Sequence, residues 1–338
     1  MSLEIIGITV LWLFLFFYII VGSIDFGAGV FNAHSIMTGK QHILSKVIQR
    51  YLSPVWEVTN VFFVFFFVGI IGFFPDSAFF FGSVLLVPAS ISIILLALRG
   101  SYYAFESYGS QGHRGYAFMY GATGILIPAS LSVVLTISEG GFVYLDDGQP
   151  VLSYELLFTS PLTWAIVVLS IVAVLYISSV FLTWYASKTE DQEATGMMRK
   201  YVLIWAVPLI VAAGGIIFEL QNHNSAHFDS ILNLWWMFAI SFVLWAITLW
   251  LIWNRRKYGL AVWLMIGQFA FAFFGYGISH YPYLLYPYLT IYDGFTNEAM
   301  AISLIVVFIL GMMLLLPSLY LLLRLFLFDP KYVKGKRE

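Results

Sequence analysis

The chain contains no cysteine and very few charged residues. The absence of cysteine from its 338 residues excludes disulfides, iron–sulfur clusters, thiolate zinc sites and cysteine nucleophiles. Charged residues make up only 10%, against about 25% in an ordinary soluble domain. Hydrophobic residues reach 61% and the mean hydropathy is +0.89. A soluble protein of this length cannot bury so much apolar surface, so the composition predicts a polytopic membrane protein.

Other absences narrow the function. The chain has no Walker A sequence and no glycine-rich phosphate loop, which argues against ATP hydrolysis. A net charge of −2 with 16 Lys and Arg gives no basic surface for nucleic acid. No Lys or Arg precedes the first apolar run, so we expect a spanning helix there and not a cleaved signal peptide.

Uncharged segments of about 20 residues predict nine transmembrane helices in a single all-α membrane domain, residues 1–338. An odd number of spans places the two termini on opposite sides of the membrane. The expected helices lie at residues 5–34, 54–75, 78–108, 115–138, 158–187, 199–218, 230–254, 258–279 and 297–327.

The basic residues predict the orientation. Fourteen of the 16 Lys and Arg fall in loops on one side of the predicted spans or at the C-terminus. The loops on the other side contain none but hold acids, among them Glu139 and Asp146. Since basic loops stay in the cytoplasm, we expect the N-terminus outside and the C-terminus in the cytoplasm.

Asp25 is the first candidate for function, because an ionisable group inside a span is costly. A helix over residues 5–34 is roughly 45 Å long and places Asp25 in the cytoplasmic half of the membrane. Gly22, Gly29 and Asn32 share its helix face. Asp25 is either a proton-carrying carboxyl or a hydrogen-bonded group in a seam between helices.

Glu57 and Asn60 lie at the start of the second expected helix. Capping by Ser53, Pro54 in the first turn and the helix dipole are enough to explain an acid at Glu57. However, Asn60 continues its face by one turn. With Asp25, the two residues are candidates for a proton pathway from the cytoplasm.

Arg99 follows 22 uncharged residues. Its side chain either extends to the membrane surface or is a fixed partner for an anion. That anion is an acid of this chain or an anionic cofactor group held by another subunit. With Trp56 and Glu106, Arg99 is a candidate for a subunit interface or an anion contact.

The histidines lie near the ends of the predicted spans, so we expect no axial haem ligand pair in this chain. His223 and His227 are four residues apart and could share a helix face, but few other ligands lie nearby. We therefore expect no metal site. His34, His42 and His113 fall on the inner side, and His223, His227 and His280 on the outer side.

Four motifs in order resemble subunit II of the cytochrome bd quinol oxidases. They are IDFGAG at residues 24–29, SPVWEVTNVF at 53–62, ALRGSYYAFE at 97–106 and YDGFTNEAM at 292–300. Nine spans and the chain length agree with that family. The chain differs where Ser23 and Ile24 replace Gly-Phe, Glu57 replaces a common Asp, and Phe62 replaces a common Trp.

The resemblance implies a haem-free subunit with two four-helix bundles and one additional helix. No catalytic residue is then expected in this chain. Its partner, subunit I, would carry haem b and haem d types and oxidise quinol while O2 is reduced to water. A small single-helix subunit and a bound quinone or lipid are further expected partners, in a bacterial or archaeal cell membrane.

Two other interpretations stay open from the residues alone. A proton-coupled transporter or channel acting by itself shares the nine spans and the buried acids. A structural scaffold would use Asp25 only for helix packing.

Overall fold

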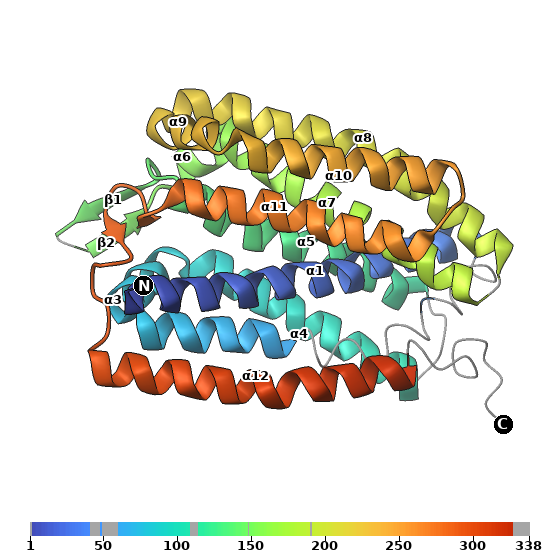
Figure 1. The fold of residues 1–338 in the computed structure, drawn as a ribbon, viewed down its shortest axis with the longest axis horizontal. Helices are drawn as coiled ribbons and strands as arrows, with labels where there is room; N and C mark the ends of the chain where they lie inside the picture. Colours follow the sequence, from blue (N-terminus) through green and yellow to red (C-terminus); the bar gives the residue numbers. More distant parts are fainter. Residues whose placement is uncertain are drawn as a thin grey trace.

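The computed structural model describes residues 2–40, 48, 60–108, 114–147, 149–189 and 191–326, without the side chains of 102–108, 322, 323, 325 and 326. Long helices run side by side along one axis (Figure 1), which confirms the all-helical prediction. Glu57 and Trp56 lie outside the described residues. The same holds for the side chain of Glu106, whose backbone is helical.

The helices are α1 (Leu3–Met37), an unlabelled helix (Asn60–Phe73), α3 (Pro75–Val84), α4 (Leu86–Tyr108), α5 (Arg114–Ser138), α6 (Tyr154–Thr159), α7 (Pro161–Lys188), α8 (Gln192–His223), α9 (Ser225–Asn233), α10 (Trp235–Trp253), α11 (Tyr258–His280) and α12 (Glu298–Phe326).

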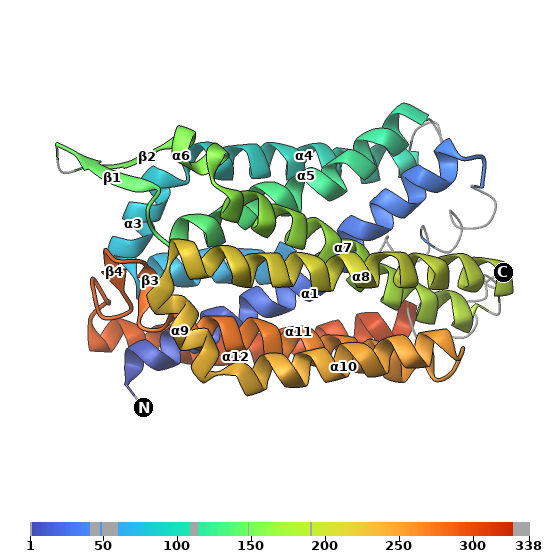
Figure 2. The same cartoon turned by 90° about the horizontal axis from the view of Figure 1, so that it is seen from above.

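Two short antiparallel hairpins, which the sequence did not predict, lie at the end of the bundle that holds α3 and the N-terminus (Figure 2). Strands β1 (Val143–Asp146) and β2 (Gln149–Leu152) pair with Val143 opposite Leu152. Strands β3 (Tyr283–Leu285) and β4 (Leu289–Thr290) pair with an irregular register.

Seven helices of the described residues are long and apolar enough to cross a membrane. The number becomes eight if the helix Asn60–Phe73 and α3 form one broken span, which is bent by 118° at the break. The break has a local cause, because Pro75 lacks a backbone N–H and disfavours helical geometry at Phe74. Nine spans therefore remain a prediction.

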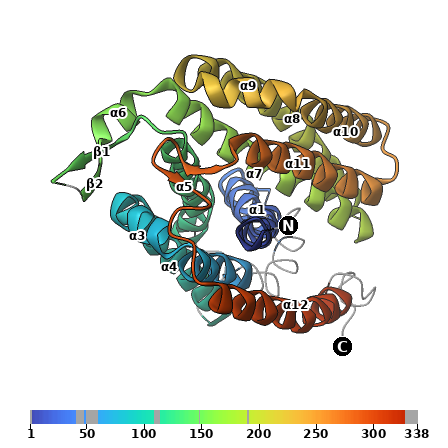
Figure 3. The ribbon, with the colours of Figure 1, turned by 60° about the vertical axis from the view of Figure 1, so that its left-hand side comes forward.

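Helix α1 lies in the middle of the bundle in the oblique view of Figure 3, and it packs mainly against α5 and α7. Every residue from Gly22 to Gly29 is buried. Glycines let the backbones come together: a Cβ at Gly27 would lie 2.4 Å from Ser178 Cβ, and one at Gly124 only 2.4 Å from the Phe26 carbonyl oxygen. Small residues serve this purpose between membrane helices.

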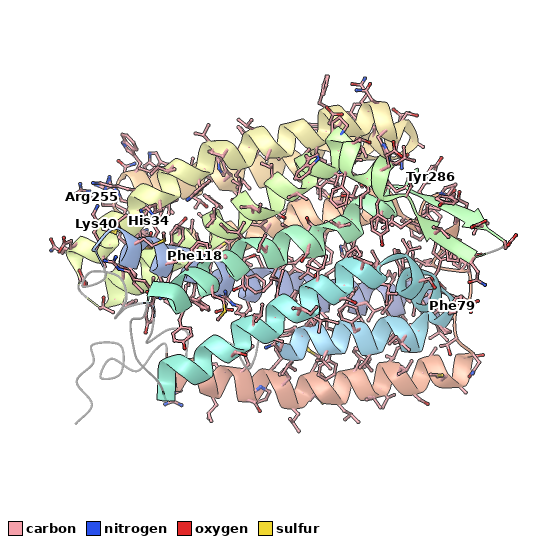
Figure 4. The ribbon with its side chains drawn as sticks, turned by 180° about the vertical axis from the view of Figure 1, so that it is seen from behind. His34, Lys40, Phe79, Phe118, Arg255 and Tyr286 are labelled. Atoms are coloured by element: carbon pink, nitrogen blue, oxygen red, sulfur yellow. The ribbon has the colours of Figure 1, made fainter. Side chains whose placement is uncertain are left out.

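The two ends of the bundle differ in character. His34, Lys40 and Arg255 lie at one end, and Phe79 and Tyr286 lie at the other (Figure 4). Between the ends, large apolar side chains such as Leu314 are exposed along the helices. Such a continuous apolar exterior needs lipid or a partner subunit to cover it.

The close contact between α1 and α5 yields a test. We expect Gly124→Ala to destabilise the protein by roughly 1–3 kcal/mol, because the new methyl group meets rigid backbone at Phe26. Gly196→Ala in α8 is the matched control, since nothing lies within 4 Å of its Cβ position. Thermal unfolding of the purified complex measures both; equal unfolding temperatures for the two variants would contradict the packing argument.

Candidate functional site

The inner candidate site is a buried ion pair between α1 and α4. Arg99 Nε donates to Asp25 Oδ2 at 2.9 Å, and both side chains are at most 2% exposed. The hydroxyl of Tyr120, from α5, donates to Asp25 Oδ1 at 3.0 Å. Three helices thus meet at one carboxylate.

Arg99 also bonds two main-chain carbonyls. Its Nη2 donates to the Asp25 carbonyl oxygen at 2.7 Å, and its Nη1 donates to the Tyr120 carbonyl oxygen at 2.9 Å. The guanidinium carbon lies 3.9 Å from the centre of the Tyr120 ring. Such a rigid, planar group with several donors is suited to a buried position where a flexible ammonium group is not.

Gly29 makes room for this arrangement. A Cβ at Gly29 would lie 2.9 Å from Tyr120 Cε1 and 3.1 Å from Arg99 Nη1. Asp25 and Gly29 share one face of α1. Asp25 supplies the acid on that face, and Gly29 leaves the room that Arg99 occupies. Asn32, one turn further, is also fully buried.

Stability alone gives little reason for such a pair. The desolvation of two buried charges offsets most of their attraction, and apolar replacements of similar volume are often neutral or stabilising. An ion pair at this depth in an apolar bundle is therefore a functional candidate. The structure pairs Asp25 and Arg99, two candidates that the sequence analysis had weighed separately.

Among the remaining candidates, Asn60 begins the helix Asn60–Phe73 and is half-buried. Glu57, the other candidate at this end of the proton pathway, lies outside the described residues. Arg99 is completely buried within this one chain, so its described contacts are intramolecular.

A second buried polar cluster lies at the opposite end of the bundle, and the sequence analysis missed it. His227 Nδ1 lies 2.9 Å from Glu139 Oε2, and His280 Nδ1 lies 3.9 Å from Glu139 Oε1. The Tyr276 hydroxyl donates to Glu139 Oε1, and Asn224 Nδ2 donates to Oε2 at 3.3 Å. We call Glu139, His227 and His280 the outer triad.

The turn after α5 directs Glu139 into the protein. Gly140 and Gly141 both adopt positive φ, at 84° and 80°. A Cβ at Gly140 would lie 2.4 Å from the Tyr286 carbonyl oxygen, so glycine is needed there on two grounds. Glu139 followed by two glycines was the available sequence signal, but its hydrogen-bond partners lie 85 and more residues away.

The charges of this cluster lower the pKa of Glu139. Burial by itself raises this pKa, but the hydrogen bond from His227, the charges of His280 and His227, and the Tyr276 hydroxyl outweigh burial. The carboxylate therefore contributes stability fully above its unfolded pKa of about 4.3. That contribution is lost as the pH falls through the lower folded pKa.

Two of the outer histidines lie around a small cavity. His227 and His280 line a cavity of about 70 Å³. Pockets for drug-sized ligands span about 300–1,000 Å³. His223 Nε2 bonds the Gly140 carbonyl oxygen at 2.9 Å.

Comparison with known proteins places these features in a family. The family model for cytochrome bd terminal oxidase subunit II matches residues 3–326. A putative cytochrome bd menaquinol oxidase subunit II from Bacillus subtilis (strain 168) is 32% identical over 342 residues, which cover 98% of this chain and 97% of that protein.

A solved structure agrees. A chain in the structure of bd oxidase from Geobacillus thermodenitrificans is 61% identical, with a TM-score of 0.86, and the match covers 97% of this chain and all of that one. These findings confirm the resemblance that the four motifs indicated. The chain belongs to the subunit II family of cytochrome bd terminal oxidases and is a multi-pass subunit of a quinol-oxidising complex in the bacterial cytoplasmic membrane.

Proposed function

We propose that this chain is a haem-free subunit II that supports a haem-bearing subunit I and supplies a cytoplasmic proton route to it. The complex would catalyse 2 QH2 + O2 → 2 Q + 2 H2O, with haem b and haem d types on the partner supplying the electron transfer and O2 chemistry. The name of the Bacillus subtilis relative specifies menaquinol, which makes menaquinol the quinol to test first. A small single-helix subunit and a bound quinone or lipid complete the proposed assembly.

The histidine contacts support the haem-free assignment. The outer histidines are engaged with Glu139, Ser279 and the Gly140 carbonyl group. His34 is exposed near the end of α1. Since membrane haems are usually held by His, sometimes with Met, these positions support axial ligands on the partner.

The buried Asp25–Arg99 pair carries the proton-route proposal. Asp25 lies within α1, surrounded by packed helices, and an ion pair there has little value for stability. A proton that reaches Asp25 has to loosen the contact with Arg99. The Tyr120 hydroxyl bonds Asp25 and can both donate and accept, so it is positioned to pass a proton onward. Glu57 and Asn60 are the proposed entrance on the cytoplasmic side.

The proposed topology has nine spans in one membrane domain, as two four-helix bundles plus one helix, with the N-terminus outside. In this orientation the end with Lys40 and Arg255 faces the cytoplasm (Figure 4). The hairpin β1–β2, which contains exposed Asp146, faces outward.

The orientation is testable because the chain has no cysteine. We expect Asp146→Cys to react with a membrane-impermeant maleimide on intact spheroplasts. Arg255→Cys should react only after the membrane is opened. A mass shift of the tagged chain reports labelling, the unmodified chain is the control, and the reverse pattern would invert the proposed topology.

The proton route is tested by removing the pair as a whole. Asp25→Asn alone leaves a buried Arg99 without its counter-charge, at a cost of about 3–5 kcal/mol. The double variant Asp25→Leu/Arg99→Met removes both charges, so we expect haem content and assembly close to wild type but O2 reduction at least tenfold slower. Tyr120→Phe should slow turnover with normal assembly. Wild-type turnover and proton uptake in the double variant would contradict the proton route and show that Asp25 serves only helix packing.

The haem-free assignment predicts that replacing the histidines of this chain leaves the haem absorption bands of the complex unchanged. We expect the tagged chain to co-purify with a second membrane chain and with haem bands in the reduced-minus-oxidised spectrum. His34→Gln, His223→Gln, His227→Gln and His280→Gln should leave those bands unchanged per complex. Loss of one haem band in any of them would assign a ligand to this chain, and a colourless, well-folded chain purified alone would favour the transporter interpretation.

A further inference from the structure

We propose that Glu139, His227 and His280 form a binding site for a divalent transition-metal ion of the zinc class at the outer end of the bundle. The three residues come from the turn after α5, from α9 and from the end of α11. One donor atom of each lies within 4.8 Å of the other two. This site goes beyond the proposed oxidase function and does not depend on it.

The spacing of the donors fits one ion. Zinc binds imidazole nitrogen and carboxylate oxygen at about 2.0–2.2 Å, which separates neighbouring ligands in a tetrahedral site by about 3.4 Å. The distances of 2.9 Å from His227 Nδ1 to Glu139 Oε2 and 3.9 Å from His280 Nδ1 to Oε1 lie on either side of that value. The three donor atoms lie within 4.8 Å of one another, so binding one ion would draw the His280 ring towards Glu139.

The donors of the triad are buried beside a small cavity. His280 is 9% exposed, and its Nε2 has no hydrogen-bond partner among the described residues. The histidines also border the cavity of about 70 Å³, which has room for a water molecule as a fourth ligand.

The neighbouring groups hold the donors as metal sites require. Tyr276 and Asn224 both donate to the Glu139 carboxylate. The Ser279 hydroxyl lies 2.8 Å from His227 Nε2 and orients that ring. Hydrogen bonds of this kind to the far side of a ligand fix its orientation and support metal affinity. Binding would release the hydrogen that His227 Nδ1 shares with Glu139.

Imidazole nitrogen and carboxylate oxygen are hard to borderline donors. Zinc binds to sets of two histidines and one carboxylate, and a water molecule takes the fourth position. The ion would join three segments far apart in the sequence, namely the turn at Glu139, α9 and the end of α11. We therefore expect zinc to raise the unfolding temperature of the complex.

The test uses the purified whole complex, stripped with a chelator and dialysed against zinc chloride. We expect the wild type to retain one more zinc equivalent per complex than His227→Gln/His280→Gln, by elemental mass spectrometry, with at least tenfold weaker binding in the variant. His223→Gln is the matched control, because His223 is a neighbouring histidine that bonds a carbonyl group outside the triad. It should bind zinc as the wild type does.

Zinc-edge X-ray absorption of the wild-type complex gives a second readout that needs no variant. We expect nitrogen and oxygen neighbours at about 2.0–2.2 Å and an imidazole signature from two histidines. Equal zinc content in wild type and double variant, equal loss in His223→Gln, or a spectrum without imidazole would each overturn the proposal. Unchanged haem content in every variant excludes a general folding defect as the cause.

Discussion

The burial of one guanidinium group constrains the centre of this protein. Arg99 is always charged and lies far from water, so every donor it carries needs an acceptor within the bundle. Asp25 supplies both its carboxylate and its main-chain carbonyl oxygen, and Tyr120 supplies another carbonyl oxygen. Because these acceptors belong to α1 and α5 while Arg99 belongs to α4, its hydrogen bonds connect the three helices.

Small residues allow the helices around this ion pair to approach one another closely. Without a Cβ at Gly29, the guanidinium and the Tyr120 ring can reach the α1 backbone. Gly124 and Gly27 bring α5 and α7 against that helix by the same means. In a lipid bilayer the hydrophobic effect does not drive helices together, so their association depends on close packing and interhelical hydrogen bonds. The IDFGAG segment therefore combines the charge and the space that this fit requires.

Composition and loop charge were enough to predict an all-helical membrane protein, and four ordered motifs indicated the family. Asp25 and Arg99 were found individually because ionisable residues inside spans are rare. Their pairing could not be read from the sequence, since 74 residues separate them and helix rotation decides which faces meet. The outer triad was missed for a related reason: Glu139 was interpreted as one of several loop acids, and only the Gly140–Gly141 turn directs it inward.

The two polar clusters differ in what their charges permit. At the inner cluster, the charge of Asp25 is balanced by Arg99, a cation that stays protonated. At the outer triad, the compensating groups are histidines, whose ring nitrogens can release a proton and accept a metal ion in its place. The cation that faces each carboxylate is therefore the basis of the two proposals. The fixed guanidinium underlies the proton-linked role proposed for Asp25, and the imidazoles underlie the metal binding proposed for Glu139.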